Sequence, residues 1–461
     1  MKSFWILLLS IVFGFAQAQE LLSEENYIKL VLQNHPLAKQ ADWMESQGFA
    51  KLLKAKGWFD PKVDLAYDQK NFDDKNYFQT LASQVKIPTW IGADVKFAYN
   101  WNAGLYINPE NNIPSNGLIS AGIELPILQG LIFDKRRADL QQGKNYAQMG
   151  SLERAQALNE LVYEASKAYW MWYEAYQIRQ IAEEGLKLAE NTFQLVKSSY
   201  ALGDKAAIDT LEALIQLQNR KIDLSSAEMA YFNNKLWASS FLWLESGEAA
   251  ELQAATIPEL FILDALDLNS YIQTLEGKED SLLASNPKLQ WYAFKIKNFE
   301  IEKRLKKEML KPQLSLGYNF LNQPLEKTPF DQFNIANYKW NLKFSMPIFL
   351  RKERADLKIT SADLAASELE FKNLQLQQRN KLLSVQNKIL VYQDQITLNS
   401  KNLEDNKNLV LAEKKKFSIG ESSLFLVNYR EINLLKVMQK QAEIEAKLKT
   451  TLAELEYTIG W

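Results

Sequence analysis

Cysteine is absent from this 461-residue chain, and histidine occurs only once, as His35. Without cysteine the chain has no disulfide, no thiolate metal site and no lipid-modified N-terminal cysteine. His35 precedes Pro36 at a helix boundary, where a lone histidine indicates local structure and not catalysis. A Gly-x-Ser-x-Gly elbow and a phosphate-binding Gly-x-x-x-x-Gly-Lys motif are also missing from the sequence. We therefore predict no catalytic residue, no metal site and no cofactor.

An excess of either charge is missing as well. Lysine and arginine number 54 against 56 aspartates and glutamates, which gives a net charge of −2 and a pI of about 5.9. A nucleic-acid-binding protein would show a basic face, so nucleic acid is not an expected partner. The acids are scattered through helices that also carry lysine and arginine, which is typical of solvated coiled-coil surface. A hydrolase that uses carboxylates alone stays open as an alternative function.

Long apolar runs are missing beyond the N-terminus. Met1-Lys2 precede an apolar run from Phe4 to Phe15 that ends in Ala16-Gln17-Ala18. This pattern predicts a secretory signal peptide over residues 1–18, cleaved before Gln19. The run is too short to span a bilayer as a helix, and no later segment offers eighteen uninterrupted apolar residues. If the exported chain crosses a membrane, strands must cross it.

A helical pattern dominates residues 138–243 and is interrupted once, at Leu202-Gly203-Asp204. Two apolar tracks recur at every seventh residue, which is the signature of a coiled-coil seam. The tracks are Ala168, Ala175, Ala182, Ala189 and Val196, and Leu186, Phe193 and Tyr200. Gly203 suits the left-handed position that ends a helix, and Asp204 could cap the next helix. We expect the chain to reverse direction there.

Strand patterns precede this helix. Apolar residues alternate with polar or small ones in segments 63–69, 77–87, 92–102 and 117–126. Asp134 is a plausible N-cap for the long helix that follows. Upstream, residues 20–34 and 37–59 resemble two shorter helices, and Pro61 ends the second.

The same order of helix, strand and turn patterns repeats in the second half of the chain. Pro61 and Pro312, like Tyr67 and Tyr318, are separated by 251 residues, and Gly203 and Gly420 by 217 residues. The second copy predicts strands at 313–321 and 338–346, and an unbroken heptad track followed by a reversal at Gly420, with Ser422 or Ser423 as the cap. The track consists of Leu382, Ile389, Ile396, Leu403, Val410 and Phe417. The change of offset indicates about one extra hairpin in the first copy.

These patterns define the expected organisation. After the signal peptide, residues 19–244 form a first repeat, 245–285 a connecting segment and 286–461 a second repeat. In the first repeat we expect strands over about 63–126, a long helix at 135–202 and a return helix at 204–244. In the second we expect strands over about 313–347, a long helix at 352–419 and a return helix at 422–457.

Four to six strands are too few to close a membrane barrel, so several chains would have to share one. Three copies would give 12 or 18 strands, depending on whether the extra hairpin joins the barrel. In the alternative interpretation, the aromatic residues of the predicted strands fill the core of a soluble β-sandwich. A sandwich, however, gives no role to helices of 65 residues.

The order and spacing of these features resemble the TolC family of outer-membrane efflux channels. The resemblance covers nearly the whole mature sequence, including Leu-Pro-Ile at 125–127, Met-Pro-Ile at 346–348 and the two glycine turns. It implies an α+β membrane protein with an internal two-fold repeat. The family forms trimers that share a transmembrane β-barrel in outer-membrane lipid and extend a long α-helical coiled-coil tunnel into the periplasm.

The resemblance also implies a passive export channel of a tripartite efflux or type I secretion system. Its partners would be a periplasmic adaptor (membrane fusion) protein and an inner-membrane efflux pump or ABC transporter. Because the chain has no nucleotide site, a partner must supply the energy. The alternative is a periplasmic coiled-coil scaffold without channel activity.

The resemblance places the functional residues at the two glycine turns. The residues that match the adaptor-docking positions are Leu202, Gly203, Asp204, Ile419, Gly420, Glu421 and Ser422. Asp209 matches an acid of the periplasmic entrance. Phe417 and Ser422 stand where relatives place a hydroxyl aromatic and a base, and Leu426 and Tyr429 stand where relatives place acids. These departures argue against a salt-bridged lock and an acidic ring at the entrance.

Overall fold

The computed structural model describes residues 20–260, 268–323 and 335–460. The predicted signal peptide therefore lies outside the described residues. The chain divides into two units, and each continues through several segments of the sequence. Unit 1 comprises Met1–Ala41, Gln156–Asn286 and Gln378–Trp461, and unit 2 comprises Asp42–Ala155 and Pro287–Gln377. The two longest helices, α3 (Lys135–Ala201) and α8 (Arg351–Ser418), contribute residues to both units.

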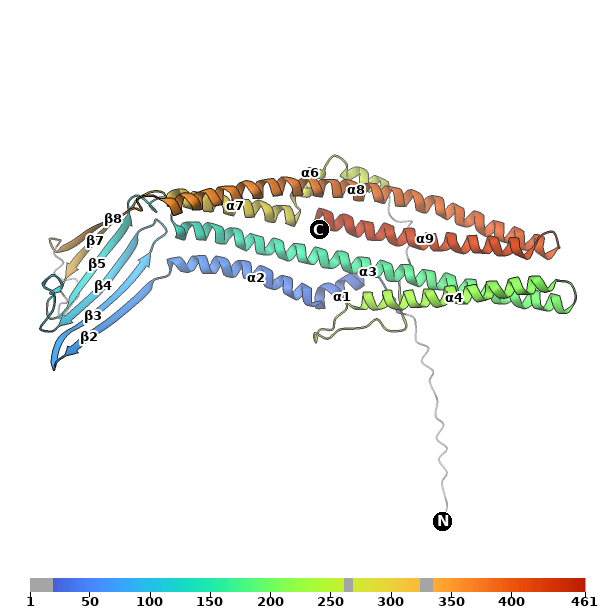
Figure 1. Cartoon of the computed structure of the whole chain (residues 1–461), viewed down its shortest axis with the longest axis horizontal. Helices are drawn as coiled ribbons and strands as arrows, with labels where there is room; N and C mark the ends of the chain where they lie inside the picture. Colours follow the sequence, from blue (N-terminus) through green and yellow to red (C-terminus); the bar gives the residue numbers. More distant parts are fainter. Residues whose placement is uncertain (1–19, 261–267, 324–334, 461) are drawn as a thin grey trace, which may run out of the picture. The chain divides into compact units, whose positions relative to one another are not determined.

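Unit 2 contains a six-stranded antiparallel sheet with the order β2-β3-β4-β5-β7-β8. Figure 1 shows the strands side by side in this order. Their bounds are β2 Lys62–Phe72, β3 Lys75–Pro88, β4 Asp94–Ala103, β5 Leu118–Pro126, β7 Gln313–Asn322 and β8 Tyr338–Ser345. The sheet therefore joins four strands of the first repeat to two of the second. The extra hairpin of the first repeat belongs to the same sheet.

The period-two pattern gives this sheet two different faces. The rung through Val63 continues through Val85, Phe97, Ala121, Phe320 and Tyr338. The neighbouring rung, on the other face, continues from Lys62 through Lys86, Lys96, Gly122, Asn319 and Lys339. Because successive side chains point to opposite faces, one face is apolar and the other polar. Large side chains of the apolar face stay exposed, among them Trp340 at 60% and Phe344 at 65%.

Helices α2 (Pro36–Lys56) and α7 (Pro287–Glu308) lead into the sheet. Within unit 2, α2 approaches α3 closely at Gly48 and Gly150. A Cβ atom added to Gly48 would lie 2.7 Å from the carbonyl oxygen of Tyr146 and 3.0 Å from the Cα of Gly150. Glycine is therefore required at this crossing because the two backbones leave no room for a side chain.

Asp134 anchors the start of α3, as the sequence predicts. Its carboxylate accepts hydrogen bonds from the backbone N–H and the Nε of Arg137, each at 3.0 Å, and from Arg136 Nε at 3.0 Å. Burial alone would raise the pKa of Asp134, but these hydrogen bonds and the two guanidinium charges lower it overall. The cap thereby satisfies a backbone donor in the first turn of the helix.

Unit 1 is built on an aromatic core. Tyr27 of α1 (Glu24–Asn34) packs on Tyr169 of α3, with ring centroids 5.5 Å apart. Trp172 is 0% exposed, and the Tyr27 hydroxyl donates a 2.8 Å hydrogen bond to the carbonyl of Ala238. The core thus fastens α1 and α4 (Ala207–Ser239) to α3.

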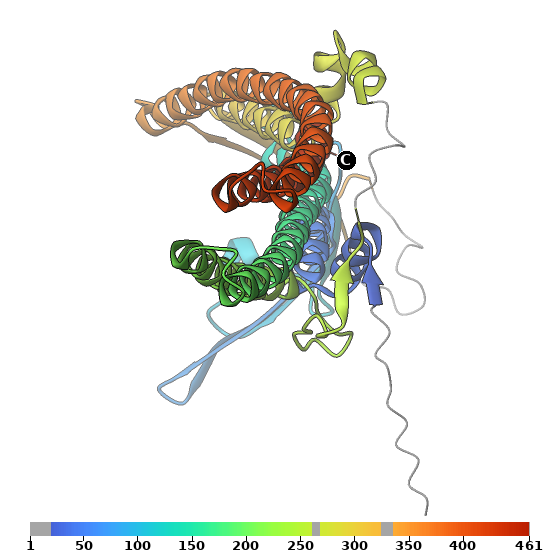
Figure 2. The ribbon, with the colours of Figure 1, turned by 90° about the vertical axis from the view of Figure 1, so that its right-hand side faces the viewer.

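The return helices lie along the ends of the long ones. Figures 1 and 2 show α4 beside the end of α3 and α9 (Leu424–Ile459) beside the end of α8. The first heptad track is buried at four positions and half-buried at Ala189, whereas Tyr200 of its neighbour is exposed. In the second copy, Leu382, Ile389, Ile396 and Val410 are buried. The heptad spacing therefore predicts the buried stripe of both long helices.

The segment near the N-terminus differs from the prediction. Residues 20–34 were expected to form one helix, but Glu20–Leu22 form strand β1, which pairs in parallel with β6 (Thr256–Pro258). Three residues are too few for a period-two pattern, so only pairing with a distant segment reveals the strand. The rest of the connecting segment holds the short helices α5 (Leu268–Leu275) and α6 (Glu279–Ala284). Among the described residues, no helix is both long and apolar enough to cross a bilayer.

Candidate functional site: the two helix-reversal turns

The two glycine turns have the same backbone structure. In the first, Gly203 N–H donates to the carbonyl of Tyr200 at 3.0 Å, and Asp204 N–H to that of Ser199 at 2.9 Å. In the second, Gly420 N–H donates to Phe417 at 3.2 Å, and Glu421 N–H to Lys416 at 2.9 Å. This paired pattern is the Schellman motif, and it requires a left-handed residue. Gly203 and Gly420 supply it, with φ angles of 84° and 82°.

The residues at both tips face solvent within the described chain. Leu202 is 78% exposed and Ile419 63% exposed, although both are large and apolar. Asp204 and Glu421 are exposed, and Ser422 is half-buried. A Cβ atom added at Gly203 or Gly420 would meet no atom within 4 Å. The seven predicted docking residues therefore form two small tips, each with one exposed aliphatic side chain.

The helix that returns from the first turn begins later than predicted. The prediction that Asp204 caps it is wrong, because α4 starts at Ala207 and its N-cap is Ala206. Asp209 supplies the missing side-chain acceptor, since its carboxylate accepts from the N–H of Ala206 at 3.3 Å. An acid three residues into a helix can cap it by reaching back, and alanine at the cap position offers no acceptor of its own. Asp209 therefore has a structural role in this turn.

The second return helix is capped by Ser423, one of the two predicted serines. Its hydroxyl accepts from the N–H of Leu426 at 3.4 Å. Ser422 instead donates a short hydrogen bond to Glu413 of α8. Arg430 of α9 also lies near Glu413, with Nε 3.8 Å from the carboxylate. Glu413 thus links the end of α8 to the turn and to the helix that leaves it.

The two turns meet through apolar and cationic contacts. Val196 of α3, Ala213 of α4 and Leu424 of α9 form a buried cluster, and Phe417 packs against it. The Nζ of Lys205 lies 4.4 Å from the centroid of the Phe417 ring. A cation over an aromatic face is attracted by the ring quadrupole. Phe417 of one turn therefore faces a base of the other turn.

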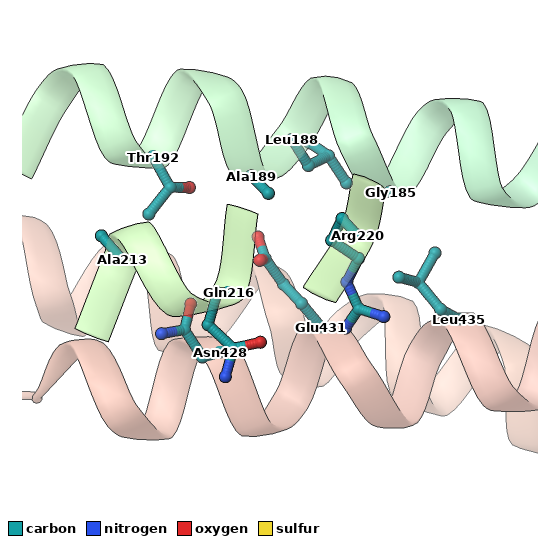
Figure 3. Close-up of a pocket in the computed structure, with 10 residues that line it drawn as sticks. All are labelled: Gly185, Leu188, Ala189, Thr192, Ala213, Gln216, Arg220, Asn428, Glu431 and Leu435. Carbon is teal, nitrogen blue, oxygen red and sulfur yellow. The ribbon is translucent and has the colours of Figure 1, made fainter. Parts of the chain in front are cut away.

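Polar residues that the sequence did not single out continue this contact along the helices. They line a small cavity between α3, α4 and α9, in which Figure 3 shows Arg220 pointing toward α9 and Glu431 pointing toward α3 and α4. Glu431 pairs with Lys414 of α8 at 2.7 Å, and Asn428 donates to Glu212 of α4 at 3.4 Å. These residues are scattered over the heptads, so spacing alone gave no signal for them. Of the predicted entrance residues, Leu426 and Tyr429 are exposed on α9.

The sequence matches the family of outer membrane efflux proteins over residues 27–235 and 280–460. The chain belongs to this family. Its two matched segments correspond to the two repeats, and the α+β TolC-like fold with an internal repeat is confirmed. This outer membrane efflux protein is accordingly assigned to the outer membrane and to efflux. The family consists of channels and not of enzymes.

Solved structures agree with the fold of this outer membrane efflux protein. The CmeC outer membrane channel of Campylobacter jejuni is 13% identical with a TM-score of 0.67, and the alignment covers 95% of this chain and 85% of that one. VceC from Vibrio cholerae gives the same identity and TM-score, with coverage of 95% and 96%. The open-state MtrE channel of Neisseria gonorrhoeae is also 13% identical with a TM-score of 0.67, with coverage of 95% and 88%. No curated protein matches the chain in sequence.

Proposed function

We propose that this protein is the passive outer-membrane duct of a tripartite efflux or type I secretion machine. Three copies assemble, and their sheets close one barrel in outer-membrane lipid while the helices form a tunnel in the periplasm. The observation that carries this proposal is the sheet of unit 2. Its apolar face exposes large side chains, and its edge strands β2 and β8 have no neighbour on one side among the described residues. Lipid and further strands are the natural complements of such a face and such edges.

The two glycine tips are proposed to dock a periplasmic adaptor, which connects the duct to an inner-membrane pump or ABC transporter. Two identical Schellman turns, each exposing an aliphatic side chain and an acid, give the adaptor equivalent contacts from both repeats. The space around both glycines is open, so a partner can approach the backbone of each tip. The chain itself is assigned no catalytic step and no cofactor.

Tip substitutions test the docking role. Gly203→Trp combined with Gly420→Trp should abolish export while trimers persist in the membrane, because the added rings project into open space. The matched control is the double alanine variant. It carries the same strain of a left-handed backbone, about 1–2 kcal/mol per site, but adds no bulky side chain. Export should survive in the alanine variant. Loss of trimers in both variants would limit the glycines to a role in folding.

Conductance separates the duct from the periplasmic scaffold. The purified trimer should be extracted only by detergent and should conduct ions in planar bilayers, whereas a scaffold would give no conductance. At the entrance, Leu426 and Tyr429 are proposed to narrow the bore with exposed, bulky side chains. Tyr429→Ala should then increase conductance. Asp209→Asn should leave conductance nearly unchanged, because this carboxylate serves its own helix cap.

A further inference from the structure

The two edges of the sheet carry complementary patterns. On the polar face, β8 presents Lys339 and Lys343, and β2 presents Asp64 and Asp68, with the same four-residue spacing. All four side chains are exposed, and among the described residues none takes part in a salt bridge. On the apolar face, β8 presents Trp340, Leu342 and Phe344 while β2 presents Val63, Leu65 and Tyr67.

We propose that β8 of one copy pairs antiparallel with β2 of the next copy, in the register that sets Ser345 opposite Lys62. This inference rests on the proposed trimeric duct and adds the surface and register by which a second copy of the chain is recognised. In this register Lys343 faces Asp64 and Lys339 faces Asp68 of the neighbouring copy. On the other face, Phe344 meets Val63, Leu342 meets Leu65 and Trp340 meets Tyr67.

The strand directions permit this pairing. The strands alternate in direction from β2 to β8, so β8 runs opposite to β2, and an added β2 beside β8 would continue the antiparallel order. Side chains alternate between faces, so only registers that differ by two residues keep apolar residues with apolar ones. The choice is therefore among a few discrete registers.

The charges select one register among these. A shift of two residues in one direction sets Lys343 opposite Lys62, and a shift in the other direction sets Lys339 opposite Lys70. Like charges directly opposite each other on neighbouring strands are destabilising, and opposite charges are favourable. A shift of four residues leaves four residues at the end of one strand without an opposite residue. Only the proposed register gives both lysines an aspartate and uses the full length of β8.

The stagger within the sheet is compatible with the same register. The rung that starts at Lys62, the first residue of β2, reaches β8 at Lys339, six residues before that strand ends at Ser345. In a symmetric ring each β2 must start at the same height along the barrel axis. The displacement along the strands between a rung and the next copy of β2, here called the stagger, is therefore the same for every copy. Setting Ser345 opposite Lys62 gives a stagger of one residue per strand. With about 3.3 Å per residue and about 4.8 Å between strands, the strands tilt by about 35°, which suits a barrel.

Because the chain has no cysteine, disulfide trapping tests the register directly. Leu65→Cys with Leu342→Cys should give covalently linked subunits on oxidation. The matched controls, Leu65→Cys with Trp340→Cys or with Phe344→Cys, sample the two neighbouring registers and keep all four charges. Opposite residues lie about 5 Å apart, whereas residues displaced by two lie about 7–8 Å apart, too far for a disulfide. The two controls should therefore link weakly.

A charge exchange provides the second test. Asp64→Lys should lower the temperature at which the trimer dissociates, and adding Lys343→Asp should restore most of the loss. Glu110→Lys, an equal charge reversal at an exposed acid outside the edge strands, should have little effect.

The outcomes separate the register from the function. Stronger linkage in either control pair, or no restoration by the exchange, would overturn the proposed register. Conducting trimers in which none of the three cysteine pairs links would show that β8 and β2 do not meet, although the duct exists. If the unmodified protein forms no trimers, the proposed function and this inference fall together.

Discussion

The aromatic core of unit 1 and the sheet of unit 2 use similar residues in opposite ways. Trp172 is 0% exposed among rings from the same chain, whereas Trp340 on the sheet is 60% exposed. The first region completes its burial within one copy. The second leaves a wide apolar surface that a soluble monomer would rarely tolerate. The contrast indicates that the aromatic core is completed within one copy, whereas the apolar face of the sheet suits an environment supplied from outside the chain.

The largest expected effect comes from removing a ring in each region. Trp172→Ala should destabilise unit 1 by about 3–5 kcal/mol, because it leaves a cavity in a closed core. Trp340→Ala removes an equal ring where one copy buries little of it, so the same unfolding measurement in detergent should change far less. Equal losses in denaturant unfolding would contradict the contrast between the two regions.

A second prediction concerns the tight helix crossing within unit 2. Gly48→Ala places a Cβ against the backbone of α3 and should cost about 1–3 kcal/mol, as overpacking does. Gly57→Ala is a suitable control because its added Cβ would meet only the Asp60 carboxylate, at 3.5 Å. Thermal unfolding of both variants measures the difference. If Gly57→Ala lowered the unfolding temperature as much as Gly48→Ala, close helix packing would not be the cause of the destabilisation.

The junction between sheet and helix should be weaker than either region's packing. Asp134→Ala removes the cap of α3 and should cost about 0.5–2 kcal/mol. Because the folded-state pKa of Asp134 is lowered, its contribution is present above the unfolded value of about 3.9 and is lost as the pH falls through the folded value. The stability difference between the variant and the parent should therefore shrink in acid, which thermal unfolding as a function of pH measures.

The smallest effect is expected from buried acids beside the aromatic core. Burial raises the pKa of Glu24, and burial together with the Glu24 charge raises that of Glu456. A carboxyl with a raised folded-state pKa stabilises the fold below its unfolded value, and this contribution is lost as the pH rises through the folded value. Glu24→Gln with Glu456→Gln should therefore flatten the decline of unfolding temperature between mildly acidic and neutral pH. An unchanged slope would show that other groups control it.

Much of the fold was predictable because its signals are local and repeated. The heptad tracks, the alternating strands and the cap at Asp134 each depend on residues close in sequence. The paired offsets of Gly203 and Gly420 placed both turns. Strand β1 and the start of α4 escaped prediction, because the first depends on a distant partner strand and the second on an acid that caps from inside the helix.

The candidate site also has one part that the sequence predicts and one part that it does not. The tips were predictable because glycine is required where a helix ends in a left-handed residue. The contact of Lys205 with Phe417, and the cavity residues Arg220 and Glu431, join residues more than two hundred positions apart. No pattern within one helix specifies such pairs, because many polar residues share the same heptad positions.

The sequence by itself determined the repeats, the two long helices, the six strands of the large sheet and the two reversals, since periodicity and glycine act over a few residues. Only the tertiary structure decided which strands become edges. That choice depends on hydrogen bonding between β5 and β7, which lie far apart in the chain. It leaves β2 and β8 at the two edges of the sheet, with aspartates on one and lysines on the other. Long-range pairing made an assembly surface from two segments that local sequence describes only as strands.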